Sequence, residues 1–431
     1  MQNGELDTAR SFRIITLGCK VNQYDSEVMR ERLIDAGWAE DRDEPDVVVI
    51  NTCTVTHRAD AKARRLIRRT AREHPGCRIA VTGCIIDRDR AFCEGLPHVW
   101  AVLPNAAKPF IAEALTAAGR PPPEDPDACL AGVSEFAGHT RAFVKVQDGC
   151  DAGCAYCIVP AVRGRERSRP ADDAVAEVAR LAVRFREVVL TGIHLGRYKD
   201  PGAGLDLAGL VGRLLGETPV DRLRLSSIEP KEITPELIEL AAGSPRLCPH
   251  FHVPLQSGSD RILDRMNRPY TAAEFLDAVG RIRARLDRPA VTTDVLVGFP
   301  GETDEDFART LATCRAAEFA RVHAFPYSAR PGTAAERMPD KVHDADVTDR
   351  KNELERLADE LALAYKEPFV GETVAVLVEA RRDRSGALCG YCPRYLRALF
   401  DGPDELMGRI EPVTIREARP HVLLGDAAEK P

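Results

Sequence analysis

Between residues 12 and 118, short apolar runs alternate with stretches in which apolar residues recur every three or four positions. The runs at 12–17, 47–50 and 78–81 predict strands, and the last two are apolar enough to be buried on both faces. Residues 25–36 and 59–73 predict helices between these strands. Such alternation is typical of a parallel sheet with right-handed crossovers. We therefore expect an α/β domain built on a flavodoxin-like parallel sheet.

From about residue 141 to 327 the alternation continues with a longer period. Strand-like runs occur at 143–147, 187–191, 223–227, 250–253, 292–297 and 322–326, and helical patterns occur at 174–185, 235–242, 272–285 and 305–317. Six strand–helix units are too few for a closed eight-stranded barrel, so we expect a partial (βα)6 TIM-like barrel. The active sites of such barrels lie at the carboxyl ends of the strands.

The last part of the chain has a different pattern. An amphipathic helix is predicted at 348–365, and it is followed by short strand-like runs at 373–379, 386–390, 395–400, 408–415 and 421–424. Glycine, aspartate and proline separate these runs. Five short strands of this kind predict a small β-barrel of the oligonucleotide-binding type. The chain thus divides into three predicted domains, at 10–122, 135–366 and 367–431.

Composition narrows the class of protein. A chain of 431 residues accommodates two or three domains. Its 13 cysteines cannot all pair, and no signal peptide or long apolar run accompanies them, which argues for metal binding or catalysis in a cytoplasmic protein and against a secreted disulfide scaffold or a membrane protein. The net charge is −7, so any nucleic-acid contact must come from local basic patches.

The richest cluster of candidate ligands is the run Cys150-Asp-Ala-Gly-Cys154-Ala-Tyr-Cys157. It supplies three thiolates, whereas a structural zinc site usually takes four protein ligands. Thiolates are the usual ligands of iron–sulfur clusters, and a [4Fe–4S] cluster held by three cysteines would keep one iron free for a substrate. A zinc knuckle or a set of buried thiols is the alternative, although no adjoining His or Cys offers a fourth ligand.

Three further cysteines follow three predicted strands of the first domain. Cys19, Cys53 and Cys84 each lie on the loop at the carboxyl end of a strand. In open parallel sheets, ligands bind in the crevice at those ends, so the pattern predicts that the three cysteines converge to hold a second cluster. Any one of them alone could be an ordinary buried cysteine.

Basic residues form three local groups, of which the first two are candidate RNA contacts. The helix after Cys53 carries a cationic row on one face, which a phosphate backbone could follow or water could simply solvate. A tail loop carries a second group, and a third follows the Cys150 run near the expected mouth of the site. These groups are Arg58, Lys62, Arg65, Arg69 and Arg72 on the helix, Arg381, Arg382 and Arg384 in the tail, and Arg163, Arg165, Arg167 and Arg169 after the cysteine run.

With these motifs in hand, the chain resembles the methylthiotransferase family of radical S-adenosylmethionine (SAM) enzymes over nearly its full length. The family landmarks are Gly18-Cys19-Lys-Val-Asn22-Gln23 with Asp25-Ser26-Glu27, Asn51-Thr-Cys53-Thr-Val-Thr56, Thr82-Gly-Cys84 and Pro254-Leu-Gln-Ser-Gly258. Residues 20–23, 54–56 and 59–60 resemble the branch that modifies N6-threonylcarbamoyladenosine in tRNA. The resemblance implies a cluster domain, a radical SAM barrel and a carboxy-terminal TRAM domain.

The resemblance also implies that SAM binds the free iron of the Cys150, Cys154 and Cys157 cluster. Tyr156 belongs to the same signature. Backbone at Thr191 and Gly192 is expected to bond the SAM ammonium, Glu229 or Gln256 the ribose hydroxyls, and Gly298 to leave room for the adenine, although glycines and prolines also simply punctuate such loops. His194 is expected to be a structural loop histidine.

The mechanism implied by the family uses both clusters, at Cys150/Cys154/Cys157 and at Cys19/Cys53/Cys84. Reductive cleavage of SAM gives a 5′-deoxyadenosyl radical that removes hydrogen from carbon 2 of the adenine next to the anticodon, and the second cluster supplies a methylated sulfur. A low-potential electron donor such as flavodoxin is implied. The alternatives are methylthiolation of another tRNA adenosine or of a ribosomal protein, and a non-catalytic RNA-binding metalloprotein.

Overall fold

A five-stranded parallel sheet forms the first part of the structure, which is a computed structural model that describes residues 11–117 and 132–428. Its strand order is β2-β1-β3-β4-β5. The strands are β1 (Ser11–Thr16), β2 (Ala39–Glu40), β3 (Val47–Thr52), β4 (Arg78–Gly83) and β5 (Val99–Leu103). This order is the flavodoxin-like one, so the predicted fold is confirmed. The predicted limits at residues 10, 122 and 431 lie outside the described residues.

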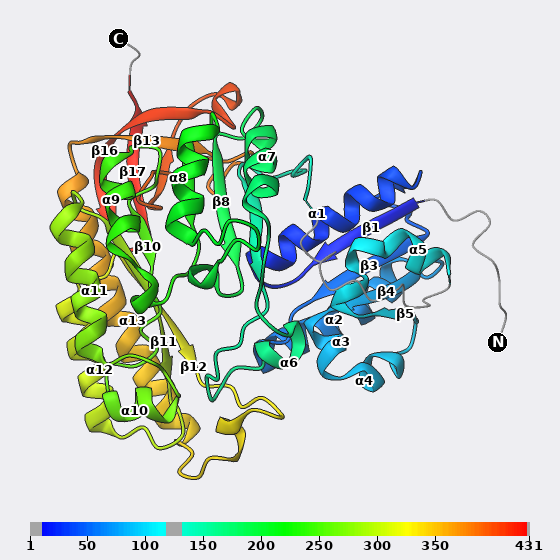
Figure 1. The fold of residues 1–431 in the computed structure, drawn as a ribbon, viewed down its shortest axis with the longest axis horizontal. Coiled ribbons are helices and arrows are strands. Elements are labelled where there is room, and N and C mark those ends of the chain that lie inside the picture. Colours follow the sequence, from blue (N-terminus) through cyan, green and yellow to red (C-terminus); the bar gives the residue numbers. More distant parts are fainter. Residues whose placement is uncertain (1–10, 118–131, 429–431) are drawn as a thin grey trace.

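Helices cover both faces of this sheet (Figure 1). One face packs against α1 and α5 through Met29 and Leu115, and the other packs against α2 and α3 through Ile67 and Ile85. The helices are α1 (Lys20–Asp35), α2 (His57–Glu73), α3 (Cys84–Arg88), α4 (Arg90–Glu94), η1 (Asn105–Phe110) and α5 (Ile111–Thr116). Helix α1 begins five residues before the predicted start at 25, because the buried Val21 and Tyr24 already belong to its packed face.

Six parallel strands form the open barrel of the central part. Strands β6, β8 and β9 pair in one sheet and β10, β11 and β12 in another, and a bridge between Ser227 and His252 joins the two. The strands are β6 (Ala142–Asp148), β8 (Glu187–Gly192), β9 (Arg222–Leu225), β10 (His250–His252), β11 (Ala290–Val297) and β12 (Arg321–Pro326), with the short antiparallel β7 (Arg167–Ser168) at one edge. The predicted partial barrel is confirmed.

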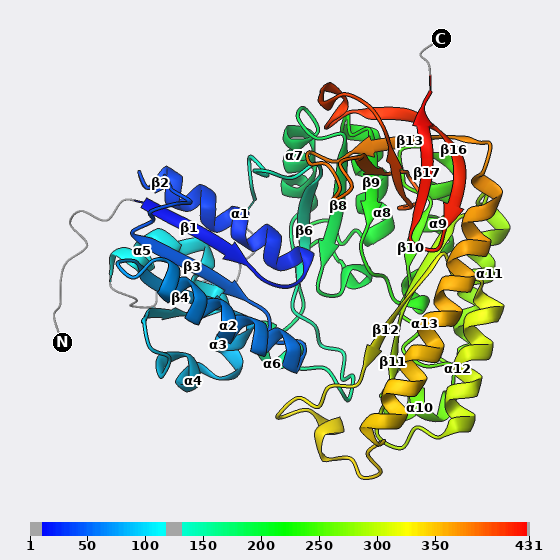
Figure 2. The ribbon, with the colours of Figure 1, turned by 180° about the vertical axis from the view of Figure 1, so that it is seen from behind.

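A layer of helices lies outside the barrel (Figures 1 and 2). These helices are α7 (Ala171–Leu181), α8 (Leu207–Glu217), α9 (Pro235–Gly243), α10 (Asp260–Arg265), α11 (Ala272–Arg285), α12 (Asp304–Ala317) and α13 (Asp344–Lys366). The short helix α6 (Val159–Arg163) lies instead next to α3 of the first domain (Figure 1). Alternate strand residues, such as Phe251, Val295 and Val322, pack under this layer. Their neighbours in sequence therefore point into the barrel.

The tail is a closed five-stranded barrel with the order β13-β14-β15-β17-β16. Its strands are β13 (Thr373–Val378), β14 (Leu388–Tyr391), β15 (Arg397–Phe400), β16 (Ile410–Arg419) and β17 (Val422–Ala427). Tyr395 lies 4.5 Å from the guanidinium of Arg224 and 5.1 Å from the ring of His250. The Arg224 guanidinium also donates to the Pro393 carbonyl at 2.8 Å and pairs with buried Glu187 at 2.9 Å. The tail thus closes one end of the central barrel.

Among the helices of the described residues, none combines the length and the apolar character needed to span a bilayer.

The end of β4 is a point where only glycine fits. Gly83 has a φ of +99°, and a Cβ at this position would lie 2.3 Å from the carbonyl oxygen of Thr52 in β3. The Gly83→Ala variant is therefore expected to lose at least ~1–3 kcal/mol of stability. Gly280, in the middle of α11, has no atom within 4 Å of such a Cβ, so Gly280→Ala should gain about 0.5–1 kcal/mol. Urea unfolding midpoints measure both, and changes of the same sign would contradict this reading of Gly83.

Candidate active site

The loop between β6 and α6 brings Cys150, Cys154 and Cys157 to the carboxyl ends of the barrel strands. All three line a cavity of about 480 Å³, together with Gly332 and Thr333 from the loop after β12. The cavity has room for an inorganic cluster beside the thiols.

Each of the three sulfurs has a nitrogen donor beside it. The backbone N–H of Ala152 lies 3.4 Å from Cys150 Sγ, that of Val159 lies 3.4 Å from Cys157 Sγ, and Arg268 Nη1 lies 3.0 Å from Cys154 Sγ. Hydrogen bonds to sulfur are one means by which proteins tune iron–sulfur clusters. Burial, with a smaller contribution from Cys154 and Cys150, raises the pKa of Cys157 to about 12. Donors to sulfur and a bound cation are what would keep this thiol ionised, so the donor set fits a thiolate-held cluster.

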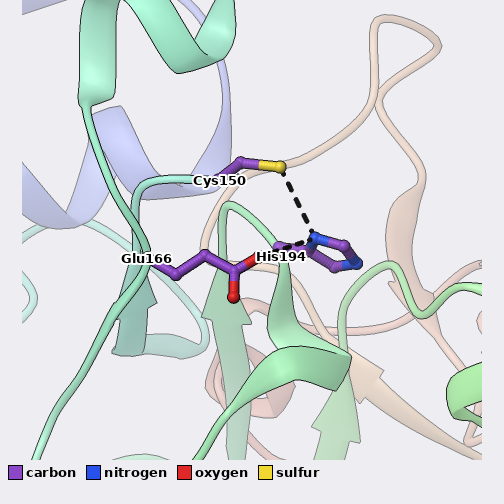
Figure 3. Close-up of side chains that lie close together, drawn as sticks. All are labelled: Cys150, Glu166 and His194. Atoms are coloured by element: carbon purple, nitrogen blue, oxygen red, sulfur yellow. Dashed lines mark hydrogen bonds and ion pairs between the residues drawn. The ribbon is translucent and has the colours of Figure 1, made fainter. Parts of the chain in front are cut away.

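His194 belongs to this site, although the sequence suggested only a structural loop role. Its Nδ1 lies 3.5 Å from Cys150 Sγ and 3.5 Å from Glu166, and Figure 3 shows the three side chains together. Its Nε2 lies 2.8 Å from Glu232. Burial lowers the pKa of His194, but the hydrogen bonds to Cys150 and Glu232 outweigh burial and raise the pKa to about 10. A cationic imidazole therefore faces the first thiol of the loop.

The structure places Cys19, Cys53 and Cys84 at one edge of the first sheet, after the adjacent strands β1, β3 and β4. Cys19 is the N-cap of the 16-residue helix α1 and is exposed. Burial, together with the neighbouring Cys84 and Cys19, raises the pKa of Cys53 to about 11. Asn105 Nδ2 lies 4.0 Å from Cys84 Sγ. Three thiols that interact electrostatically at one sheet edge suit a bound cluster.

A buried charge cluster joins the two cysteine sites. Asp25, from α1, contacts Lys108 Nζ at 2.8 Å, Lys145 Nζ at 2.6 Å and Arg163 Nη1 at 2.9 Å. Asp148 shares two of these cations, with Lys145 at 3.0 Å and Arg163 at 3.3 Å. We call these five side chains the Asp25 cluster. Burial raises the pKa of Asp25, but the three cations outweigh burial and hold that pKa well below its usual range.

The Asp25 cluster lies between the loops that carry the two sets of cysteines. Arg163 also donates to the side chain of Asn22, three residues after Cys19, while Asp148 lies two residues before Cys150. The same side chains line a cavity of about 270 Å³ between the two parts of the chain. The cluster domain is thereby attached to the barrel at the base of both cysteine loops.

One expectation for this region is wrong. The arginines after the Cys150 run do not form a common surface patch, because Arg163 lies in the Asp25 cluster and Arg169 pairs with buried Glu177 and with Tyr24 of α1. Both arginines therefore serve the contact between domains. The sequence showed their charge but not the acidic partners, which lie on other elements.

The predicted SAM contacts surround the same end of the barrel. Gly192 ends β8 beside Gln147, whose Oε1 accepts the backbone N–H of His194 at 2.7 Å. Glu229 pairs with Arg268, the arginine that also reaches Cys154. Gln256 has a φ of 62° and bridges to β11. Thr191 precedes Gly192 on β8 and is buried.

Gly298 lies close to a side chain of helix α13. A Cβ on Gly298 would lie 2.4 Å from the side chain of Val347 in α13, and Phe299 is fully buried near Tyr327. Protein therefore fills the side of Gly298 on which a side chain would lie, and room for an adenine along the Gly298 backbone stays a prediction. Tyr156 packs against this same small apolar cluster, under the Cys150 loop.

Comparison with known proteins identifies the family. Matching family models are the uncharacterized protein family UPF0004 at residues 11–103, the radical SAM superfamily at 144–314 and the TRAM domain at 368–428. The threonylcarbamoyladenosine tRNA methylthiotransferase MtaB of Chlamydia pneumoniae is 39% identical over 86% of this chain and 87% of its own length. The chain belongs to the methylthiotransferase family of radical SAM enzymes.

Two other relatives agree with this assignment, and one solved structure shares the fold. MtaB of Bacillus subtilis is 36% identical over 94% of this methylthiotransferase and 93% of its own length. A tRNA-2-methylthio-N(6)-dimethylallyladenosine synthase from Pelotomaculum thermopropionicum is also 36% identical, over 95% of this chain and 96% of its own. The radical SAM methyltransferase TsrM from Kitasatospora setae shares the fold, with a TM-score of 0.56, 16% identity and coverage of 76% of this chain and 77% of its own.

The methylthiotransferase exposes the cationic row of α2 as predicted from its spacing. Arg58, Lys62, Arg65, Arg69 and Arg72 are all exposed, and Arg69 pairs with Glu73 at 3.2 Å. Arg381, Arg382 and Arg384 are exposed in the loop between β13 and β14, where Arg382 is held by Asp404 at 2.7 Å.

Neutralising Asp25 tests the role of the Asp25 cluster. In the Asp25→Asn variant, Lys108, Lys145 and Arg163 keep only one carboxylate between them, so we expect a loss of roughly 3–5 kcal/mol of stability and faster amide exchange in α1 and β6. Because the pKa of Asp25 is depressed, its contribution is present at neutral pH and is lost as pH falls below about 4.

The matched control is Asp35→Asn at the other end of α1. The side chain of Asp35 is 71% exposed and lies 3.9 Å from Arg32, so this change should affect stability little. Equal effects of the two substitutions would show that the Asp25 cluster does not hold the domains together.

Proposed function

We propose that this methylthiotransferase acts in the cytoplasm on tRNA and adds a methylthio group to carbon 2 of N6-threonylcarbamoyladenosine, on the 3′ side of the anticodon, using SAM and two [4Fe–4S] clusters. The observation that carries the proposal is the pair of three-cysteine sites at the carboxyl ends of adjoining parallel sheets, attached to each other through the Asp25 cluster. The printed names of the MtaB relatives support the tRNA nucleoside.

The residues present fit both cofactors. Cys150, Cys154 and Cys157 would hold one cluster, with SAM on its free iron, and Cys19, Cys53 and Cys84 would hold the other. When bound, the first cluster and SAM supply a radical able to open an unactivated C–H bond, and the second supplies the sulfur. A low-potential donor such as flavodoxin is proposed as the electron source.

The surrounding side chains orient these groups. Arg268 contacts Cys154 and Glu229 at once, so the two predicted contacts, with the cluster and with the SAM ribose, are fixed relative to each other. Glu232 and Glu166 hold His194 against Cys150 from two sides. The buried Gln147 amide donates to the Gly149 carbonyl at 2.8 Å, which fixes the start of the cysteine loop. These contacts form a rigid wall around the proposed SAM site.

Replacing the two cysteine triads is expected to remove different activities of the enzyme. Changing Cys150, Cys154 and Cys157 to Ala should abolish both 5′-deoxyadenosine formation and methylthiolation. Changing Cys19, Cys53 and Cys84 to Ala should leave about half of the iron, since one of two thiolate-held clusters is lost, and should preserve SAM cleavage while abolishing the methylthio product. Iron content, 5′-deoxyadenosine and modified nucleosides are measured on each reconstituted protein.

A triple Ala variant of Cys77, Cys93 and Cys314, which lie away from both triads, is the control and should keep both activities. Sustained methylthiolation by the Cys19/Cys53/Cys84 variant would show that these residues serve only in packing, and it would contradict the proposal of two clusters. Full zinc occupancy and no iron in the wild-type protein would favour the non-catalytic metalloprotein.

The cationic surfaces predict a salt-dependent interaction with tRNA. Replacing Arg58, Lys62 and Arg65 on α2 by Ala should weaken tRNA binding and lower the slope of log K against log salt by roughly 0.7–0.9 for each phosphate that is no longer neutralised. The same experiment on Arg381, Arg382 and Arg384 tests the tail loop. SAM cleavage without tRNA should not change in either variant.

Binding is measured by filter retention across a salt series. The control is Arg309→Ala, Arg315→Ala on α12, the outer layer of the barrel. A salt slope identical to that of the wild-type protein would remove the corresponding patch from the tRNA interface.

A further inference from the structure

The inner face of the barrel carries a group of polar side chains that no step above uses. His252 of β10, Asp294 of β11 and His323 of β12 lie on the strand faces opposite the helix layer, and their ligand atoms all lie within 4.8 Å of one another. His252 Nε2 lies 3.3 Å from Asp294, and His252 Nδ1 lies 3.0 Å from Thr292 Oγ1. His252 is therefore fixed in orientation, whereas His323 has no hydrogen-bond partner among the described residues.

Lys20 brings a cation from the other domain to this group. It is the first residue of α1, whose starting end faces the barrel in both views (Figures 1 and 2). Lys20 interacts electrostatically with Asp294 and with His323 and His250 of the barrel strands. It is half-buried, yet in residues 11–117 and 132–428 no acceptor lies within hydrogen-bond or ion-pair distance of its ammonium group. A half-buried cation of this kind can be paired by an anionic group of a ligand.

The charge balance of the group is positive. Asp294 is the acidic member, whereas Lys20 and Arg321 are the basic members. Burial and the charge of Arg224 lower the pKa of Lys20. Burial and the charge of Arg321 lower the pKa of His323 to about 4, and His252 and Lys20 lower it too, against the opposing effect of Asp294. His323 is therefore a neutral imidazole at pH 7, with an N–H that can donate to an anion.

An exposed aromatic ring lies beside these cations. Phe325 is 45% exposed and lies two residues after His323 on the same face of β12. The two rings are stacked, with 6.3 Å between centroids and an interplanar angle of 25°. Exposed aromatic faces of this kind stack on nucleobases.

We propose that Lys20 and His323 bind the carboxylate of an anionic side arm on the substrate nucleoside, while Phe325 supports its base. The inference rests on the proposed function and adds the residues that select the substrate. A threonylcarbamoyl group ends in a carboxylate, whereas a dimethylallyl group is apolar, so this pocket favours the first nucleoside over the second. Lys20 directly follows Cys19, which places the side-arm contact next to the proposed sulfur-bearing site.

His252, Asp294 and His323 together have the composition of a two-histidine, one-carboxylate metal site. The positive charges of Lys20 and Arg321 next to His323 oppose a divalent cation there. An anion would be attracted by the positive charges of Lys20 and Arg321, and it would give the Lys20 ammonium group a partner. Metal occupancy is therefore an outcome that the experiment must distinguish.

The test compares two anticodon stem–loops, one with N6-threonylcarbamoyladenosine and one in which the threonine carboxylate is a carboxamide of the same size. The reconstituted wild-type enzyme should methylthiolate the carboxylate form with a kcat/KM about 10- to 100-fold higher, since hydrogen bonds to a charged group give a preference of that size. Lys20→Gln and His323→Phe should each reduce this preference severalfold, through loss of activity on the carboxylate form alone.

The exposed Lys62→Gln variant on α2 is the control, because a phosphate contact affects both stem–loops equally. Iron content should stay at the wild-type level in Lys20→Gln, which separates the pocket from the neighbouring Cys19.

Three results would contradict the proposal that this pocket binds the carboxylate of the substrate. Equal activity of the wild-type enzyme on both stem–loops would do so while leaving the proposed function intact. A preference that survives in both Lys20→Gln and His323→Phe would do the same. Metal beyond the two clusters, present in the wild-type protein and lost in His323→Phe, would assign the group to a cation. Methylthiolation of neither stem–loop would instead overturn the proposed function itself.

Discussion

The structure depends most on the carboxylate of Asp25, which is buried with three cations from three different elements. Removing so many charges from water is costly unless each finds a partner, and here Asp25 and Asp148 supply the partners. Because one end of the Asp25 cluster lies next to Cys19 and the other next to Cys150, its geometry sets the distance between the two cysteine sites. A packed apolar interface could hold the domains together, but charged groups of fixed direction also define their orientation.

The tail barrel contributes to the same arrangement from the opposite end. Buried Glu187 pairs with Arg224 and Arg141, and Tyr395 of the tail lies against Arg224. This contact closes the end of the barrel remote from the cysteine loops. The inner face of the barrel lies close to Lys20 of the first domain, which interacts electrostatically with Asp294 and His323.

Much of this architecture could be predicted from local patterns, because strand and helix periods are local properties. The helix at 272–285 and the six barrel strands were predicted within two residues or so of their bounds. What depends on pairing between distant residues could not be predicted, such as the Asp25 cluster or the contact of His194 with Cys150. One signal was available and missed: in His250-Phe-His252 and in Arg321-Val-His-Ala-Phe325, polar or aromatic residues alternate with apolar ones, which marks an inward face that is not packed core.

In the proposed function, the two cysteine sites, the Asp25 cluster between them and the cationic inner face of the barrel belong to one enzyme. Its proposed substrate is an adenosine in tRNA that carries a carboxylate. Mass spectrometry of tRNA nucleosides from cells that lack the gene tests this most directly. The account predicts that 2-methylthio-N6-threonylcarbamoyladenosine disappears, that N6-threonylcarbamoyladenosine accumulates in its place, and that the wild-type gene restores the product. Unchanged levels of this nucleoside, or the loss of a different methylthiolated nucleoside, would contradict it.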